Sequence, residues 1–195
     1  MKYSVSDLNE LIRDRRTIYP KDYTAREVHR DIIERVLQNA TWAPTHGLTQ
    51  PWRFTVFTNA ALSRLSAFLG DEYTRLTPPE KFLQKKFDNQ TQRPLKSTVV
   101  IALGMARDPS GKISELEEMH AMACAVQNMH LTCTAYGLGG FWQTGAAATG
   151  DGIRAFLGLA EKDRCLGLFY IGYPAIEWPK GYRKSWVDLV KWESG

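Results

Sequence analysis

The sequence lacks any apolar run that approaches the roughly 20 residues needed to cross a bilayer. Residues 1–14 lack the apolar centre of a signal peptide, so we expect no export and a cytoplasmic protein. The 195 residues contain no internal repeat, low-complexity tract or linker. We therefore expect one globular domain spanning residues 1–195, with no membrane partner.

Cysteine is also scarce. The three cysteines, Cys124, Cys133 and Cys165, form no Cys-x-x-Cys pair and have no zinc-ligand spacing to a histidine. The four histidines have no metal-ligand partners at suitable spacing either. We expect free, buried thiols in a reducing cytosol and no metal site.

Several enzyme motifs are missing. There is no Gly-x-x-x-x-Gly-Lys-Ser/Thr phosphate loop, no Gly-x-Ser-x-Gly nucleophile turn and no His-Glu-x-x-His zinc helix. The glycine-rich residues 137–140 follow a predicted helix instead of a strand, so they are no dinucleotide fingerprint. We therefore expect no catalytic side chain of the protein's own, and a bound organic cofactor becomes the better candidate.

The charge balance is modestly basic, with 25 lysines and arginines against 21 acidic residues and a pI near 9.0. This excess suits an anionic cofactor or substrate. A basic nucleic-acid-binding module is an alternative of another class. However, the basic residues are scattered and no recognition motif is present, so we expect no nucleic-acid partner.

Hydrophobic periodicity predicts an irregular alternation of helices and strands. Helices are expected over residues 5–14, from Thr24 to about residue 41, and over 61–69, 114–136 and 151–157. Strands are expected over residues 53–58, 97–105 and 165–173, and residues 71–94 as a polar surface excursion with a short helix. Capping boxes at residues 24–27 and 114–117 and stops at Gly70 and Gly137 support these bounds. This order indicates a mixed sheet layered with helices.

Residues 15–17, Arg-Arg-Thr, form the first segment that suits a cofactor. Two guanidiniums and a hydroxyl at the end of a helix can clamp a phosphate or a ring carbonyl by charge-assisted hydrogen bonds. The competing interpretation is that the arginines merely complement the carboxyl end of the first helix.

The second segment is the loop over residues 42–52, between a helix and a strand. Trp42 and Trp52 can wall a heterocycle, while His46 and Gln50 can hydrogen-bond its edge. A rigid structural turn with packed tryptophans explains the same residues.

The third segment, residues 139–145, reads Gly-Gly-Phe-Trp-Gln-Thr-Gly. Its glycines let a planar ligand approach the backbone, where Trp142 and Thr144 can face it. A buried strand edge with glycine bulges is the alternative.

In this order, the segments resemble the nitroreductase family, especially its short-chain bacterial branch. Arg-Arg-Thr stands where the family usually has Arg-Arg-Ser. The resemblance continues through Ala43-Pro44, Gln50-Pro51-Trp52 and the helix ending in residues 137–140. It closes on residues 171–174, Ile-Gly-Tyr-Pro, and 182–184, Tyr-Arg-Lys, and so covers nearly the whole chain.

The resemblance implies an α+β fold of three layers with a central mixed sheet, a domain-exchanging homodimer and FMN at the subunit interface. Residues 15–17 would hold the phosphate, ribityl chain and ring edge, and residues 142–144 would line the pyrimidine side. Residues 42–50 would come from the second subunit, and the basic tail would complete the phosphate site. The implied FMN contacts are Arg15, Arg16, Thr17, Trp42, His46, Gln50, Trp142, Gln143, Thr144, Arg183 and Lys184. The implied nicotinamide contacts are Thr132, Cys133, Thr134, Ala135, Tyr136 and Gly137.

The implied activity is hydride transfer from NADH or NADPH through bound FMN to a small electrophile, such as a nitroaromatic or a quinone, with ping-pong kinetics. Two alternatives remain on the same fold: a flavin-storage protein without turnover, and a specialised dehalogenase or desaturase with residues 71–94 as a lid. Where the family often has serine and asparagine, the loop before Gln50 carries His46, which leaves acceptor preference open.

Overall fold

A four-stranded sheet forms the middle of the molecule, within a computed structural model that describes residues 2–194. Met1 and Gly195, the ends of the predicted domain and tail, lie outside that range. The strands are β1 (Trp52–Phe57), β2 (Val99–Met105), β3 (Gly139–Gln143) and β4 (Arg164–Gly172). Their order in the sheet is β1-β2-β4-β3, and all three pairings are antiparallel, so these strands do not form the mixed sheet that was predicted. An isolated parallel bridge joins Thr17 to Gly140 beside β3.

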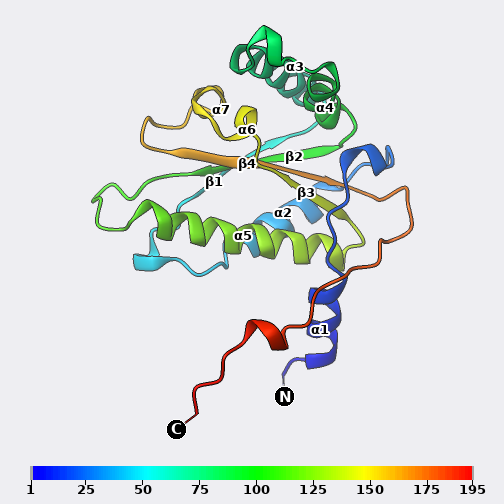
Figure 1. The fold of residues 1–195 in the computed structure, drawn as a ribbon, viewed down its shortest axis with the longest axis vertical. Helices are drawn as coiled ribbons and strands as arrows, with labels where there is room; N and C mark the ends of the chain where they lie inside the picture. The colour runs from blue at the N-terminus through cyan, green and yellow to red at the C-terminus, as the bar shows by residue number, and fades with distance from the viewer. Residues whose placement is uncertain (1, 195) are drawn as a thin grey trace.

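Helices cover both faces of this sheet, as Figure 1 shows. On one face lie α2 (Arg30–Ala40) and α5 (Glu115–Ala135), and on the other α3 (Ala60–Leu76), α4 (Gln84–Leu95), α6 (Ala146–Thr149) and α7 (Asp151–Phe156). The central strand β2 is buried on both sides, with Ile101 in one core and Val100 in the other. The expected three-layer α+β fold is confirmed.

Short 3₁₀ turns and the two ends of the chain complete the molecule. The turns are Pro20–Asp22, His46–Leu48, Pro79–Lys81 and Val187–Leu189. Helix α1 (Val5–Asp14) and the C-terminal segment lie together, below one end of α5 in Figure 1.

Two predicted helix starts and one predicted stop are confirmed by their caps. Ser4 caps α1 by accepting a hydrogen bond from the backbone amide of Asp7 at 3.3 Å. The side chains of Ser114 and Glu117 form the predicted capping box at the start of α5. Gly137, with φ +67°, follows the end of this helix in the left-handed conformation that glycine adopts without strain.

The capping box predicted at residues 24–27 is wrong, because α2 begins at Arg30. The hydroxyl of Thr24 accepts a hydrogen bond from the amide of Arg26 at 3.3 Å and forms a local turn. Threonine side chains offer the backbone this alternative to a helix. Val28 is buried although it precedes the helix.

The helix predicted to stop at Gly70 is longer, and the excursion over residues 71–94 is more ordered than expected. Helix α3 continues through Gly70 to Leu76 because α4 packs along it, with Phe87 and Thr91 against Gly70. Tyr73 joins the contact through Phe82, their ring centroids 5.3 Å apart. Tertiary packing of this kind commonly overrides local stop signals.

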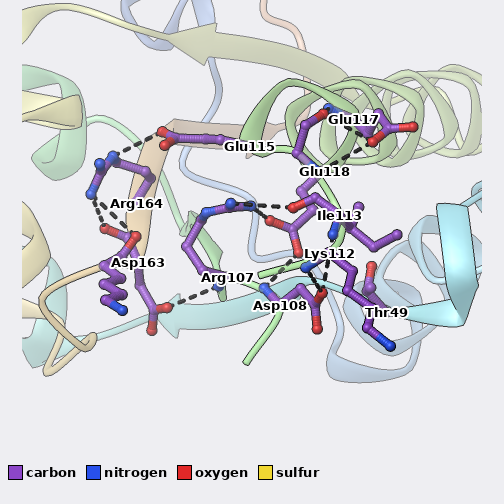
Figure 2. A network of polar contacts seen from close by, with 12 residues as sticks. Thr49, Arg107, Asp108, Lys112, Ile113, Glu115, Glu117, Glu118, Asp163 and Arg164 are labelled. Atoms are coloured by element: carbon purple, nitrogen blue, oxygen red, sulfur yellow. Dashed lines mark hydrogen bonds and ion pairs between the residues drawn. The ribbon is translucent and has the colours of Figure 1, made fainter. Parts of the chain in front are cut away.

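A polar network fixes the start of α5 and is drawn in Figure 2. The buried carboxylate of Glu118 pairs with the guanidinium of Arg107 and accepts the backbone amide of Asp108 at 2.8 Å. Asp163 accepts the amide of Arg107 at 2.9 Å. The loop between β2 and α5 is thereby tied both to the helix and to the segment before β4.

The thiols only partly match the prediction. Cys133 and Cys165 are buried, and burial raises the pKa of their thiols to about 12 and about 11. Cys124 is exposed on α5, so the expectation of a buried thiol is wrong there. None of the helices within residues 2–194 is both long enough and apolar enough to span a bilayer.

Replacing Glu118 with alanine tests the network. The change leaves the buried guanidinium of Arg107 without its counter-charge, so we expect the free energy of unfolding to fall by about 3–5 kcal/mol. Urea denaturation followed by circular dichroism measures this loss.

Glu115→Ala is the matched control, because the Glu115–Arg164 pair is 3.0 Å long but half exposed. Its loss costs about 0–1 kcal/mol. Equal losses in the two variants would contradict the role assigned to Glu118.

Candidate functional site

A cavity of about 790 Å³ opens between the end of α1, one face of α5, strand β3 and the C-terminal segment. The two ends of the chain and its centre therefore meet at one place. It is lined by Ile12, Arg13, Asp14, Arg15, Arg16, Ala123, Val126, Gln127, His130, Trp142, Gly181, Tyr182 and Arg183. Four of the predicted FMN-contacting residues, Arg15, Arg16, Trp142 and Arg183, are thus brought together.

Arg15 lines the cavity with a guanidinium that no described side chain pairs with. It is half-buried, and within residues 2–194 its guanidinium has no hydrogen bond and no carboxylate within 4 Å. Burial lowers the pKa of Arg15, and the nearby charges of Arg183 and Arg16 lower it further. Crowded guanidiniums without a counter-charge form a site that favours an anion.

Arg16 has a different task. Its Nε donates to the carbonyl of Pro179 at 2.9 Å, and its Nη1 donates to the carbonyls of Arg15, at 2.8 Å, and Arg13. Trp178 adds a second tie by donating its indole N–H to the carbonyl of Asp14 at 2.6 Å. Arg16 thus complements the end of α1, as the competing interpretation had it, and holds the C-terminal segment beside it.

Strand β3 presents successive side chains to opposite faces of the sheet. Trp142 lines the cavity and donates its indole N–H to the carbonyl of Leu166 at 2.9 Å. Gln143 instead is buried on the other face, where it accepts from the hydroxyl of Tyr170 at 2.9 Å and donates to Gln90 at 2.6 Å. The side chains of Trp142 and Gln143 therefore do not line the same side of a ligand site.

Three further predicted FMN contacts, near β3 and in the C-terminal segment, do not line the cavity. Thr17 bridges to Gly140, so its backbone lies beside β3 although it does not line the cavity. Thr144 follows the strand and is exposed. Lys184 is exposed next to Arg183 and lines no part of the cavity.

Sequence reasoning missed the contribution of α5. Ala123, Gln127 and His130 reach the cavity from one face of this helix, at the three- and four-residue spacing of an α-helix. The spacing of these three residues is the signal in the sequence that could have identified them. Burial and, to a lesser degree, Arg15 lower the pKa of His130 to about 4.

Trp42, His46 and Gln50 line no part of this cavity, and His46 lies near the start of α5. The Nδ1 atom of His46 is 2.6 Å from Glu117, which holds the pKa of that carboxyl below its usual range. Glu117 precedes His130 on α5 by 13 positions, or about 20 Å of helix. Within one chain, His46 therefore does not reach His130, and the loop lines none of the cavity.

The loop itself is strained. Leu48 and Gln50 adopt left-handed backbone conformations, with φ of 52° and 45°, which are uncommon for residues other than glycine. The hydroxyl of Thr45 holds this shape through Thr49, at 3.1 Å, and the amide of Gln50, at 3.3 Å. Held strain of this kind is typical of ligand-contacting loops, and Trp42 beside it is 81% exposed.

The first residues of the predicted nicotinamide segment, Thr132–Gly137, are buried. Cys133 is buried in the core, and Thr132 is bonded to Asn39 at 3.0 Å. Only Ala135, Tyr136 and Gly137 are exposed at the carboxyl end of α5.

The sequence model of the Nitroreductase family matches residues 12–173. A candidate NAD(P)H nitroreductase of Escherichia coli (strain K12), YdjA, is 28% identical over 145 residues, which cover 74% of this chain and 77% of YdjA. A candidate NAD(P)H nitroreductase of Haemophilus influenzae is 29% identical over 78% of this chain and 81% of its own.

Solved structures share the fold. A nitroreductase-like protein from Bacillus cereus superposes with a TM-score of 0.84 at 24% identity, covering 100% of this chain and 99% of its own. A candidate nitroreductase from Desulfovibrio desulfuricans, solved in complex with FMN, gives a TM-score of 0.70 at 22% identity. It covers 96% of this chain and 97% of its own.

The lowered pKa of His130 predicts an acid-dependent loss of stability. The unfolded chain binds the proton near pH 6.5 and the folded chain only near pH 4. The contribution of His130 is therefore fully present above pH 6.5 and is lost as the pH falls toward 4. We expect His130→Gln to lose about 3 kcal/mol less than the natural protein between pH 7 and 4.

Urea denaturation of both proteins at each pH measures the difference, and the other acid-titrating groups cancel between them. If the free energy of unfolding fell equally with pH in the two proteins, His130 would titrate normally. That result would contradict its burial in the cavity wall.

Proposed function

Because this chain belongs to the nitroreductase family, we propose that it transfers hydride from NADH or NADPH, through bound FMN, to a small electrophile. Nitroaromatics and quinones are the proposed acceptor classes, with ping-pong kinetics. The observation that carries the proposal is the cavity in which Arg15, Arg16 and Arg183 meet without a carboxylate partner among residues 2–194.

The residues of the cavity fit FMN. Its phosphate would supply the counter-charge that Arg15 lacks, with Arg183 as the second cation. Trp142 offers a half-buried indole as a wall for the ring system. Arg16 supports this site by fixing the C-terminal segment, and so Arg183, beside α1.

FMN, when bound, supplies a ring that takes hydride from a reduced nicotinamide and passes electrons to an oxidant. The protein binds and orients the participants and excludes water from the buried side of the cavity. Arg15 and Arg183 would hold the phosphate, and Trp142 of β3 would contact the ring system. No protein acid or base is required for these tasks, in keeping with the absence of a catalytic motif from the sequence.

We propose that a second copy of the chain completes the site. Trp42, His46 and Gln50 are exposed and line no part of the cavity of their own chain, so a second subunit could bring them to the same flavin. Large apolar side chains exposed on α1 and the C-terminal segment supply an interface: Val5, Leu8, Ile12, Tyr182, Trp186, Leu189 and Trp192. Monomers rarely expose apolar surface on this scale.

For the nicotinamide, the exposed carboxyl end of α5 is the proposed contact surface. Ala135, Tyr136 and Gly137 remain in that proposal, whereas Cys133 is enclosed in the core. The helices of residues 71–94 lie on the sheet face opposite α5, so they do not cover this cavity as a lid (Figure 1).

Removing the free guanidinium tests phosphate binding. In Arg15→Ala, we expect the affinity for FMN to fall about ten- to a hundredfold, the usual effect of losing a hydrogen bond to a charged group. Affinity for riboflavin, which has no phosphate, should change little. Fluorescence titration of the flavin-free protein measures both.

Arg64→Ala is the control, because it removes the same charge from the exposed surface of α3 and should leave both affinities unchanged. An unchanged FMN affinity in Arg15→Ala would overturn the phosphate site.

Anaerobic reduction tests the activity. The protein loaded with FMN should lose its yellow absorbance when NADH or NADPH is added, and regain it when a quinone follows. Stopped-flow absorbance resolves the two halves, and initial rates should give the parallel double-reciprocal lines of a ping-pong reaction. Flavin that stays oxidised with both nicotinamides would instead indicate a storage protein.

A further inference from the structure

His130 holds a distinctive place in the cavity. It is the only ionisable residue that α5 contributes to the lining, and its neighbours there are Ala123, Val126 and Gln127. Its ring packs edge-on against Phe169, with centroids 4.7 Å apart. The Nδ1 side of the ring lies so close to Gly140 that a Cβ at that position would come within 2.9 Å.

This imidazole has no protein partner. The residue is 8% exposed, yet none of its ring nitrogens makes a hydrogen bond within residues 2–194. Other buried polar side chains of α5 are paired, Glu118 with Arg107 and Thr132 with Asn39. The ring nitrogens of His130 are therefore free to hydrogen-bond a ligand that enters the cavity.

Burial, with the help of Arg15, keeps the free imidazole neutral. The charged and titratable groups at the cavity are Arg13, Asp14, Arg15 and Arg16 from α1 and its end, with Tyr182 and Arg183 from the C-terminal segment. From β3 and β4, only Trp142 and Phe169 face the ring. Burial and Arg15 together lower the pKa of His130 to about 4. At neutral pH, its ring can therefore both donate and accept a hydrogen bond.

We propose that His130 is a ligand-contacting residue of this cavity, hydrogen-bonded to the bound flavin nucleotide, and that it takes up a proton more readily once the phosphate anion is in place. The second part follows from electrostatics. An anion bound to Arg15 and Arg183 offsets the positive charge that disfavours protonation of His130. A flavin without phosphate leaves that positive charge uncompensated. This inference rests on the proposed function, because it assumes FMN as the ligand.

NMR of protein with ¹³C-labelled histidine tests the proposal, with His130→Gln used to assign the signal. In flavin-free protein, the His130 signal should stay in its neutral form down to about pH 4.5. With saturating FMN, its titration midpoint should rise by about one pH unit or more, while riboflavin should shift the signal without a comparable rise. A His130 signal unmoved by bound FMN overturns the inference.

Binding measurements give an independent readout. His130→Phe keeps an aromatic ring without a hydrogen-bonding atom and should weaken FMN about three- to tenfold at pH 7, with His130→Gln partly restoring affinity. Equal FMN affinities in all three proteins would also overturn the inference. If the natural protein binds no FMN at any pH, it is the proposed function that fails, so the two failures are distinguishable.

Discussion

Repulsion between like charges is the constraint on which the site depends. Arg15, Arg16 and Arg183 meet at one cavity, and within residues 2–194 no carboxylate pairs with them. Burial lowers the pKa of Arg15, and the charges of Arg183 and Arg16 lower it further. The arrangement becomes favourable when an anion from outside binds, which is why the phosphate of FMN accounts for it best.

Hydrogen bonds between the two ends of the chain hold these cations close together. Arg16 donates to the carbonyl of Pro179, and Trp178 donates to the carbonyl of Asp14, so the C-terminal segment is fastened to the end of α1. On the other side, α5 is fixed at its start by the pair of Glu118 and Arg107. The backbone of Gly140 lets this helix approach β3 closely enough for the ring of His130 to reach the cavity.

The sequence predicted those parts of the fold whose cause is local. The capping box at Ser114 and the continuous apolar strand β2 depend on neighbouring residues alone, and both are confirmed. The bounds of α2 and α3 were wrong because a local turn at Thr24 and the packing of α4 decide them. In the site, the cluster of Arg15, Trp142 and Arg183 followed from the resemblance. The orientation of Gln143 and the role of His130 did not, since they depend on which face of a strand or helix meets the cavity.

A crystal structure of the protein with FMN tests the central claim most directly. The account predicts the phosphate within hydrogen-bonding distance of the guanidinium of Arg15, the ring system against Trp142, and the loop of His46 arriving from a second subunit. FMN bound at another place, or with its phosphate away from Arg15 and Arg183, would contradict the account.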